Sequence, residues 1–190
     1  MDAVRASRIS GGNPAYGRVE SDLYPTPPDV TLALLEFLKP MKGTVVWEPA
    51  SGEGHMAAAL RSFGLEVVES DIQRGEDFLK IPKKECDWII TNPPFSCAEE
   101  FVLRCAEHQV PFALLLKSQY WHAKKRLPLF ERAQPDFVLP LTWRPDFLFG
   151  TRGKGRPLMD VMWVVWGPMR GACGTHYKPL ARPKIEMEGK

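Results

Sequence analysis

Apolar residues occur along this chain in two kinds of stretch, short continuous runs and longer segments with helical spacing. Short runs bounded by turn residues are typical of buried strands, whereas apolar positions three and four apart indicate the inner face of a helix. Strands are predicted at 44–47, 65–70, 86–91, 111–116, 136–141 and 161–166. Helices are predicted at 29–38, 56–60, 98–108 and 124–132. This alternation of strands and helices is typical of an α/β domain.

The segments outside this alternation are polar or irregular. Residues 1–22 are rich in Gly, Ser and Arg and are predicted to be a flexible lead-in. Residues 142–160 are rich in glycine and are predicted to form a long loop, and loops of this length are usually functional or mobile. The predicted organisation is therefore a lead-in at 1–22, a single domain at 23–167, and a tail without clear periodicity at 168–190.

The composition is that of one ordinary globular domain, with 190 residues of which 44% are hydrophobic and 25% are charged. No apolar run approaches the roughly 18 residues of a membrane span, and the first residues lack the apolar core of a signal peptide. We therefore expect a cytoplasmic protein that does not contact membranes. The four cysteines form no Cys-x-x-Cys pair and have no histidine at ligand spacing, so we expect free thiols and no metal site.

The strand predicted at 86–91 is followed by Asn92-Pro93-Pro94-Phe95. Two successive prolines remove two backbone donors and fix φ, so neither a strand nor a helix can continue there. The strand therefore ends in a rigid tip, at the edge where open α/β sheets bind ligands. This tip offers the side-chain carbonyl of Asn92, a free backbone carbonyl at Pro93 or Pro94, and the flat ring of Phe95. Two acceptors beside a ring suit a planar group that bears an NH2, such as adenine; a turn that merely ends the strand is the alternative.

A glycine-containing loop, EPASGEG at 48–54, connects the first predicted strand to the helix at 56–60. Gly52 and Gly54 permit a tight turn and a close approach of a ligand to the backbone, and the following helix presents free amide donors. The loop lacks the Lys-Ser/Thr ending of a phosphate-binding loop, which disfavours hydrolysis of nucleoside triphosphates. Glycines alone are a weak signal, because any tight turn between a strand and a helix uses them. Glu48 and Pro49 at the start of the loop make the pattern more specific.

Acidic residues follow the second predicted strand. Asp71 lies 23 positions after Glu48 (71 − 48), close to the spacing of about 20 at which an acid reaches the ribose hydroxyls of a nucleotide. An exposed loop aspartate is the competing interpretation. Asp77 and Phe78 come shortly afterwards and place an acceptor and a ring where an adenine could lie.

The net charge of +2 is unevenly distributed along the chain. Between Lys117 and Arg156, nine basic residues stand against three acidic ones, a local excess of +6 (9 − 3), and aromatic residues are interleaved with them. A solvated surface is the usual explanation of a charge run. Because aromatic residues are interleaved with the charges, a nucleic-acid-binding surface explains this run equally well. The residues predicted to contact nucleic acid are Lys124, Lys125, Arg126, Arg144, Arg152, Lys154 and Arg156.

Three motifs taken together resemble those of a known family: Tyr24-Pro25-Thr26-Pro27-Pro28, the loop at 48–54, and Asn92-Pro93-Pro94-Phe95. Their order and spacing resemble the adenine-specific, S-adenosylmethionine-dependent amino-methyltransferases, particularly the small DNA adenine methyltransferases of phages and prophages. The resemblance covers about residues 22–120 well and the strands up to 166 loosely. It implies an α/β fold of the class I methyltransferases: a doubly wound, Rossmann-like, mostly parallel seven-stranded sheet with helices on both faces and a reversed last strand.

The resemblance also implies a role for each motif. S-adenosylmethionine would be the cofactor and S-adenosylhomocysteine the product. The cofactor would be held by Glu48, Pro49, Ala50, Gly52 and Gly54 at its methionine part, by Asp71 at its ribose, and by Asp77 and Phe78 at its adenine. Tyr24, Thr26 and Pro27 would close over the methionine end. The catalytic tip, which would grip and stack on a target adenine flipped out of DNA, would consist of Asn92, Pro93, Pro94 and Phe95.

Several alternatives stay open at this stage. Larger members of the family carry a separate target-recognition region, for which this chain has no room, so recognition is predicted to rest on the basic residues or on a partner, with the chain a monomer or a homodimer. DNA is the predicted partner. Adenine in RNA and the amide of a glutamine side chain are alternative acceptors, because the same tip suits any planar NH2. A nucleic-acid-binding protein that has lost catalysis is a further alternative.

Overall fold

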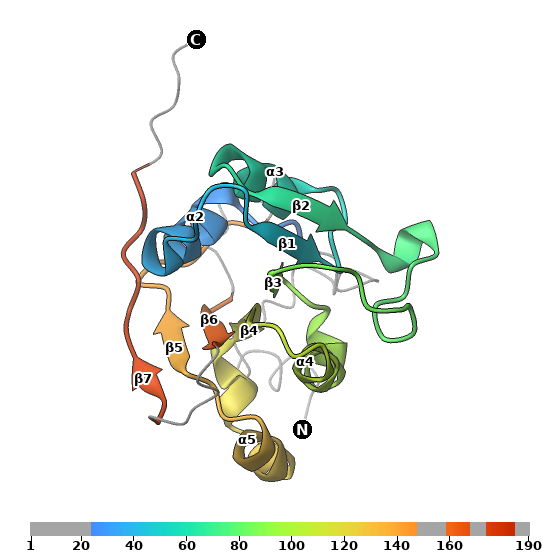
Figure 1. Ribbon diagram of the computed structural model, residues 1–190. Coiled ribbons are helices and arrows are strands. Elements are labelled where there is room, and N and C mark those ends of the chain that lie inside the picture. The colour runs from blue at the N-terminus through green and yellow to red at the C-terminus, as the bar shows by residue number, and fades with distance from the viewer. Residues whose placement is uncertain (1–23, 148–158, 168–173, 185–190) are drawn as a thin grey trace, which may run out of the picture.

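The computed structural model describes residues 24–147, 159–167 and 174–184 (Figure 1). The lead-in predicted at 1–22 lies outside the described residues, and so do Arg152, Lys154 and Arg156. Within the described part of the chain, no helix has both the length and the apolar character that crossing a bilayer requires.

A seven-stranded sheet forms the centre of the described structure, with strand order β2-β1-β3-β4-β6-β5-β7 (Figure 1). Its strands are β1 Val45–Glu48, β2 Glu66–Glu69, β3 Trp88–Thr91, β4 Phe112–Lys117, β5 Phe137–Pro140, β6 Val161–Trp166 and β7 His176–Tyr177. Neighbouring strands pair in parallel except at β6, which runs antiparallel to both β4 and β5. The predicted α/β fold with a mostly parallel sheet and one reversed strand is therefore confirmed.

Helices flank the sheet, and each begins within a residue or two of its predicted start, except the last. They are α2 Pro28–Leu38, α3 His55–Ser62, α4 Ala98–Glu107 and α5 Leu127–Arg132. The helix predicted at 124–132 is divided, because a 3-10 turn at Lys124–Arg126 precedes α5. Pro128 explains the break: it has no N–H to donate and is tolerated in the first turn of a helix, so α5 starts beside it.

The reversed strand is not the last one along the chain. The sequence suggested that the strand at 161–166 was final and that the tail had no periodicity, yet β7 lies in that tail and pairs in parallel with β5. Only His176 and Tyr177 form β7, and both are exposed. A two-residue strand with neither alternation nor burial leaves no hydrophobic pattern in the sequence, so the pattern could not predict it.

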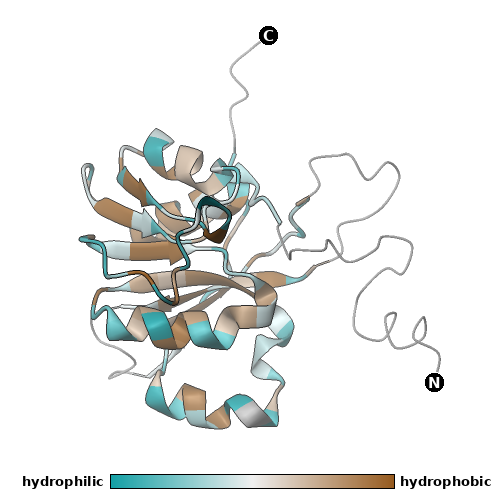
Figure 2. Ribbon diagram, turned by 90° about the vertical axis from the view of Figure 1, so that its right-hand side faces the viewer, coloured by the Kyte–Doolittle hydropathy of each residue, from teal (hydrophilic) through white to brown (hydrophobic). Residues whose placement is uncertain are grey.

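The sheet is covered on both faces, and alternate residues of the strands β1 to β6 supply the two cores. Val46, Ile90 and Leu115 face the core that α2 and α3 cover. Trp47, Ile89 and Leu114 face the opposite core, which α4 and α5 cover. Strands buried on both sides carry near-continuous apolar sequences, which is why in Figure 2 the strands hold much of the hydrophobic colour.

The strand order places a crevice at β1. From β1 the chain passes to β2 on one side, and later to β3 on the other side. At such a reversal of strand order, the loops after the two inner strands separate, and ligands bind between them at the carboxyl ends. The loop after Glu48 and the tip beginning at Asn92 therefore face the same crevice.

Replacement of Leu115 by alanine tests this core. Leu115 is fully buried in β4 opposite Trp163 of β6, so Leu115→Ala should lower the free energy of unfolding by about 2–5 kcal/mol, measured by urea denaturation. The control is Leu127→Ala in α5, where the side chain is 57% exposed and the same truncation should change stability little. Equal losses in the two variants would contradict the assignment of Leu115 to the core.

Candidate functional site

A cavity of about 380 Å³ lies at the carboxyl ends of β1, β2 and β3. Three segments that are far apart in sequence meet in its walls: 24–26, 48–53 and the tip after β3. The predicted site residues that line it are Tyr24, Thr26, Glu48, Pro49, Ala50, Gly52, Asp71, Asp77, Phe78, Asn92 and Pro94. Four predicted residues, Pro27, Gly54, Pro93 and Phe95, are not among those that line it.

The side chain of Asn92 is held in one orientation. Its Nδ2 donates to the backbone carbonyl of Tyr24, at 3.1 Å, and to Oγ1 of Thr26, at 3.0 Å. Because a backbone carbonyl only accepts, the nitrogen of the amide has to face this side. Oδ1 consequently lies on the other side, where it is buried and has no hydrogen-bond partner among the described residues. An acceptor in this state is ready for a donor supplied by a ligand.

Phe95 lies beside the cavity rather than in its wall. Its ring contacts Tyr24, with 5.8 Å between ring centroids, and Nζ of Lys117 lies 4.2 Å from its centroid. Lys117 ends β4, the strand next to β3, so the neighbouring strand brings a positive charge to the tip. The family resemblance did not include Lys117, and its position depends on the pairing of β3 with β4.

The glycine loop after β1 buries an acid. Glu48 is 2% exposed, and its Oε2 has no hydrogen-bond partner in the described structure. Burial, reinforced by the negative charge of Glu69, raises the pKa of Glu48 to about 8. Without a ligand, Glu48 is therefore largely protonated at neutral pH, and a cation placed against it would favour the ionised form.

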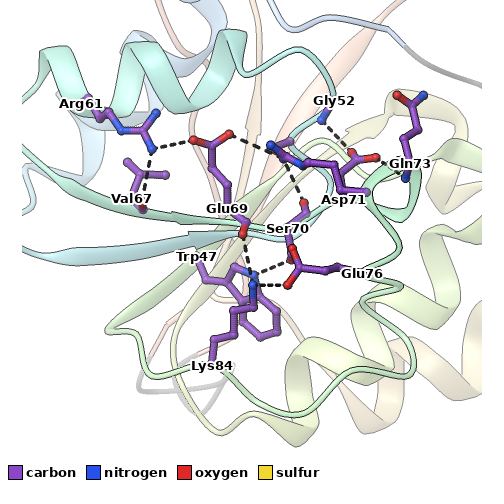
Figure 3. Close-up of polar contacts among 12 residues, drawn as sticks. Trp47, Gly52, Arg61, Val67, Glu69, Ser70, Asp71, Gln73, Glu76 and Lys84 are labelled. Carbon is purple, nitrogen blue, oxygen red and sulfur yellow. Dashed lines mark hydrogen bonds and ion pairs between the residues drawn. The ribbon is translucent and has the colours of Figure 1, made fainter.

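Asp71 connects the loop after β2 to the glycine loop after β1. It is 4% exposed, its Oδ2 accepts from the backbone N–H of Gly52 at 2.7 Å, and its Oδ1 accepts from that of Gln73 at 2.8 Å (Figure 3). Gly52 has a φ of 49°, a left-handed conformation that favours glycine. A carboxylate has about four acceptor positions, so Asp71 retains capacity for hydroxyl donors after these two bonds.

A charged network at the β2 edge supports these loops (Figure 3). Arg61 of α3 donates to Glu69 at 2.6 Å, and Arg74 lies 3.8 Å from the same carboxylate and donates to Oγ of Ser51. Lys84 binds the backbone carbonyl of Glu69, at 3.2 Å. No sequence pattern marks these residues, because each is an ordinary charged residue until the fold brings it to the loop.

The far end of the cavity is formed by Asp77 and Phe78. Oδ1 of Asp77 accepts from the N–H of Leu79 at 3.0 Å, and its other oxygen pairs with Lys80, which lowers the pKa of Asp77. Phe78 is 2% exposed and its ring lies against Phe101, with 4.9 Å between centroids. Ile72 also lines this end although it is 66% exposed, and the sequence analysis missed it. The available signal in the sequence was an isolated apolar residue in a polar segment, directly after Asp71.

The basic residues predicted to contact nucleic acid have different surroundings. Lys124 is exposed, whereas Arg126 lies over the ring of Tyr120 and 3.7 Å from Glu99. Arg144 pairs with Asp160 at 2.7 Å. The side chain of Lys125 is not described. The charges of Arg126 and Arg144 are therefore partly balanced within the protein.

Comparison with solved structures identifies the architecture. A modification subunit of a putative type I restriction enzyme from Vibrio vulnificus superimposes with a TM-score of 0.60 and 14% identity, over 98% of this chain and 51% of that one. A putative class I S-adenosylmethionine-dependent methyltransferase from Listeria monocytogenes gives 0.54 and 11%, over 80% and 64%. The chain has the class I methyltransferase fold.

A third protein with this fold is a putative RNA methyltransferase from Pyrococcus horikoshii, with a TM-score of 0.56 and 16% identity over 79% of this chain and 89% of that one. The chain spans about half the length of the type I restriction-modification subunits that it matches. No family model and no curated protein matches the sequence. The similarity thus rests on the class I methyltransferase fold.

The buried acid predicts an unusual dependence of stability on pH. Between pH 4.5 and about 8, Glu48 is ionised in the unfolded chain but protonated in the folded one, so its contribution to stability falls as the pH rises. Glu48→Gln removes this loss. Relative to the unmodified protein, the variant should gain a few kcal/mol in free energy of unfolding between pH 5 and pH 8, measured by urea denaturation. Glu36→Gln, an exposed change on α2, should produce no such gain, and a Glu48→Gln profile parallel to the wild type would disprove the assignment.

Proposed function

We propose that the protein transfers a methyl group from S-adenosylmethionine to the exocyclic amino group of adenine in DNA. The observation that carries this proposal is the fixed amide of Asn92, a residue of the cavity wall whose side-chain oxygen is buried and has no hydrogen-bond partner among the described residues. The class I methyltransferase fold supports methyl transfer, and the three motifs support an amino acceptor. The fold comparison alone supports no particular acceptor, so the proposal for adenine rests on the tip.

The residues of the cavity fit S-adenosylmethionine. Oε2 of Glu48, which is unpaired among the residues that the structure describes, suits the positively charged amino group of the methionine part. The glycine loop permits close approach of the backbone. Asp71 has remaining acceptor capacity for ribose hydroxyls, while Asp77, Phe78 and the exposed Ile72 suit the adenine. The bound cofactor supplies a methyl group on a sulfonium, an activated donor that requires neither a nucleophilic side chain nor a metal ion.

The protein's own contribution is to hold the acceptor. The amino group of adenine is a weak nucleophile because its lone pair is delocalised into the ring. An N–H donated to Oδ1 of Asn92, and a second donated to a backbone carbonyl of Pro93 or Pro94, would favour a tetrahedral nitrogen with its lone pair directed at the methyl group. The nitrogen would gain the methyl group as its bond to the sulfonium sulfur breaks and leaves a neutral thioether, and it would release one hydrogen as a proton to solvent. Two hydrogen bonds, to Tyr24 and Thr26, hold the nitrogen of Asn92 away from this acceptor position.

The target base would have to leave the duplex to reach Asn92. Phe95, whose ring now contacts Lys117 and Tyr24, would then stack on it. The residues proposed to contact the backbone of the nucleic acid remain Lys124, Lys125, Arg126, Arg144, Arg152, Lys154 and Arg156. The partner in this proposal is DNA, bound by a monomer or a homodimer; RNA and a glutamine amide are the alternative acceptors.

The acceptor is tested by a methylation assay with tritiated S-adenosylmethionine. Unmethylated DNA, total RNA and a protein extract are incubated separately with the protein, and the labelled product of any positive sample is digested and identified. We expect label in DNA as N6-methyladenine. Label found only in RNA, or only in protein, would show that RNA or protein, and not DNA, is the acceptor. Absence of label, together with absence of cofactor binding in calorimetry, would disprove methyl transfer.

Two variants separate transfer from cofactor binding. Asn92→Ala removes the acceptor oxygen, so we expect kcat to fall at least a hundredfold while the Kd for S-adenosylmethionine changes less than about twofold. Asp77→Asn keeps the oxygen that accepts from Leu79 but removes the charge, and it should weaken cofactor binding with a smaller effect on kcat at saturation. Loss of cofactor binding in both variants to the same extent would show that Asn92 was misassigned.

A further inference from the structure

A buried carboxylate outside the cavity joins three remote parts of the chain. Asp29 lies in the first turn of α2 and is 3% exposed. Its Oδ2 accepts from the indole Nε1 of Trp143 at 3.0 Å and from Nε of Arg182 at 2.7 Å. These donors lie 114 and 153 positions further along the chain. A negative charge in the first turn stabilises a helix, but that effect does not require partners from two other segments.

Arg182 is brought to Asp29 by the segment that follows β7. His176 and Tyr177 pair with β5, and the backbone carbonyl of Leu180 accepts from both the N–H and the hydroxyl of Thr142, at 3.1 and 2.9 Å. Leu180 itself is buried and contributes to the core under α2. In Figure 1 this segment, in red, passes β5 and continues beside α2. The far end of the described chain is thus fixed against the beginning of α2.

The anchored turn is rigidly connected to Asn92. Pro25, Pro27 and Pro28 restrict the backbone between Tyr24 and Asp29, so a displacement of the first turn of α2 is carried into residues 24–26. Those residues supply the carbonyl of Tyr24 and the hydroxyl of Thr26 that hold the nitrogen of Asn92. The same turn is fastened from the sheet, where Nε1 of Trp163 donates to the carbonyl of Val30 at 2.9 Å.

We propose that Asp29, paired with Arg182, is a positioning residue that keeps the amide of Asn92 in its productive orientation. Removal of the pair would let the first turn of α2 shift, and the hydrogen bonds that Nδ2 of Asn92 donates to Tyr24 and Thr26 would lengthen. The amide could then rotate and bring Nδ2, a donor, to the place of the acceptor oxygen. The inference rests on the proposed function of Asn92, and it makes the segment after β7 part of the site's support although that segment does not line the cavity.

The test combines kinetics with a readout that needs no activity. Asp29→Asn keeps the size of the side chain and removes its charge. It should lower kcat about tenfold while the Kd for S-adenosylmethionine and the KM for DNA stay within about twofold, measured well below the melting temperature. In parallel, hydrogen exchange of the Asn92 side-chain NH2, followed by NMR, should be slow in the wild type and at least tenfold faster in Asp29→Asn.

The partner residue is tested by a double-mutant cycle. Arg182→Gln should reduce kcat in the same direction as Asp29→Asn, and the double variant should be no worse than Asp29→Asn alone, because both changes remove one interaction. Arg182→Lys, which retains a cation, should restore most of the activity. Effects of Asp29→Asn and Arg182→Gln that multiply in the double variant would overturn the pairing.

A matched control separates positioning from general destabilisation. Thr175→Val removes the hydroxyl that donates to the carbonyl of Pro135 at 2.7 Å, so it loosens the same segment at β7, away from Asp29. It should lower the melting temperature but leave kcat and the exchange of the Asn92 amide unchanged. An equal loss of kcat in Thr175→Val, or unchanged kcat and exchange in Asp29→Asn, would overturn the proposal. If the wild type transfers no methyl group, the proposed function fails, while the exchange measurement still decides whether Asp29 positions Asn92.

Discussion

The geometry of the site depends on one hydrogen bond, from Nδ2 of Asn92 to the backbone carbonyl of Tyr24. A carboxamide has a donating and an accepting end, and either could face a ligand if nothing fixed it. The carbonyl of Tyr24 can only accept, so it determines which end is turned away from the ligand. The second bond, to Thr26, restrains the same nitrogen. The oxygen is left buried and without a partner in the described part of the chain, so it is suited to a ligand that carries a donor, such as an NH2.

Two buried oxygens of residues that line the cavity lower the stability of the ligand-free protein. Oδ1 of Asn92 and Oε2 of Glu48 are both buried without partners among the described residues, and a buried polar group in this state costs about 1–3 kcal/mol. The cost is offset by the two dense cores on either side of the sheet. A ligand that donates to both oxygens would remove this cost and gain it as binding free energy. A cation that binds Glu48 would favour its ionised form, so the affinity for such a cation depends on the protonation of Glu48.

The walls of the cavity are held in place by contacts from residues outside it. Asp71 ties the glycine loop to the loop after β2 (Figure 3). Arg74 links the same two loops, because it pairs with Glu69 and donates to Ser51 of the glycine loop. On the other side, Trp143, Trp163 and Arg182 fasten the beginning of α2. The loops after β1 and β2 and the beginning of α2 are therefore all held by residues outside the cavity wall. Preorganised polar groups require such support.

The sequence by itself determined the α/β alternation, the six longer strands and most of the cavity wall, because hydrophobic runs, glycines and prolines act locally on the backbone. Asn92 and Asp71 could be named in advance since each directly follows a strand, and parallel strands bring their carboxyl ends to one edge. The two-residue β7, the divided helix at Lys124–Arg126, and the contacts of Lys117 with Phe95 were decided by the tertiary structure. So was the junction at Asp29, whose partners lie more than a hundred positions away. Burial, charge balance and the orientation of an amide depend on neighbours that only the folded chain brings together, so no local pattern could specify them.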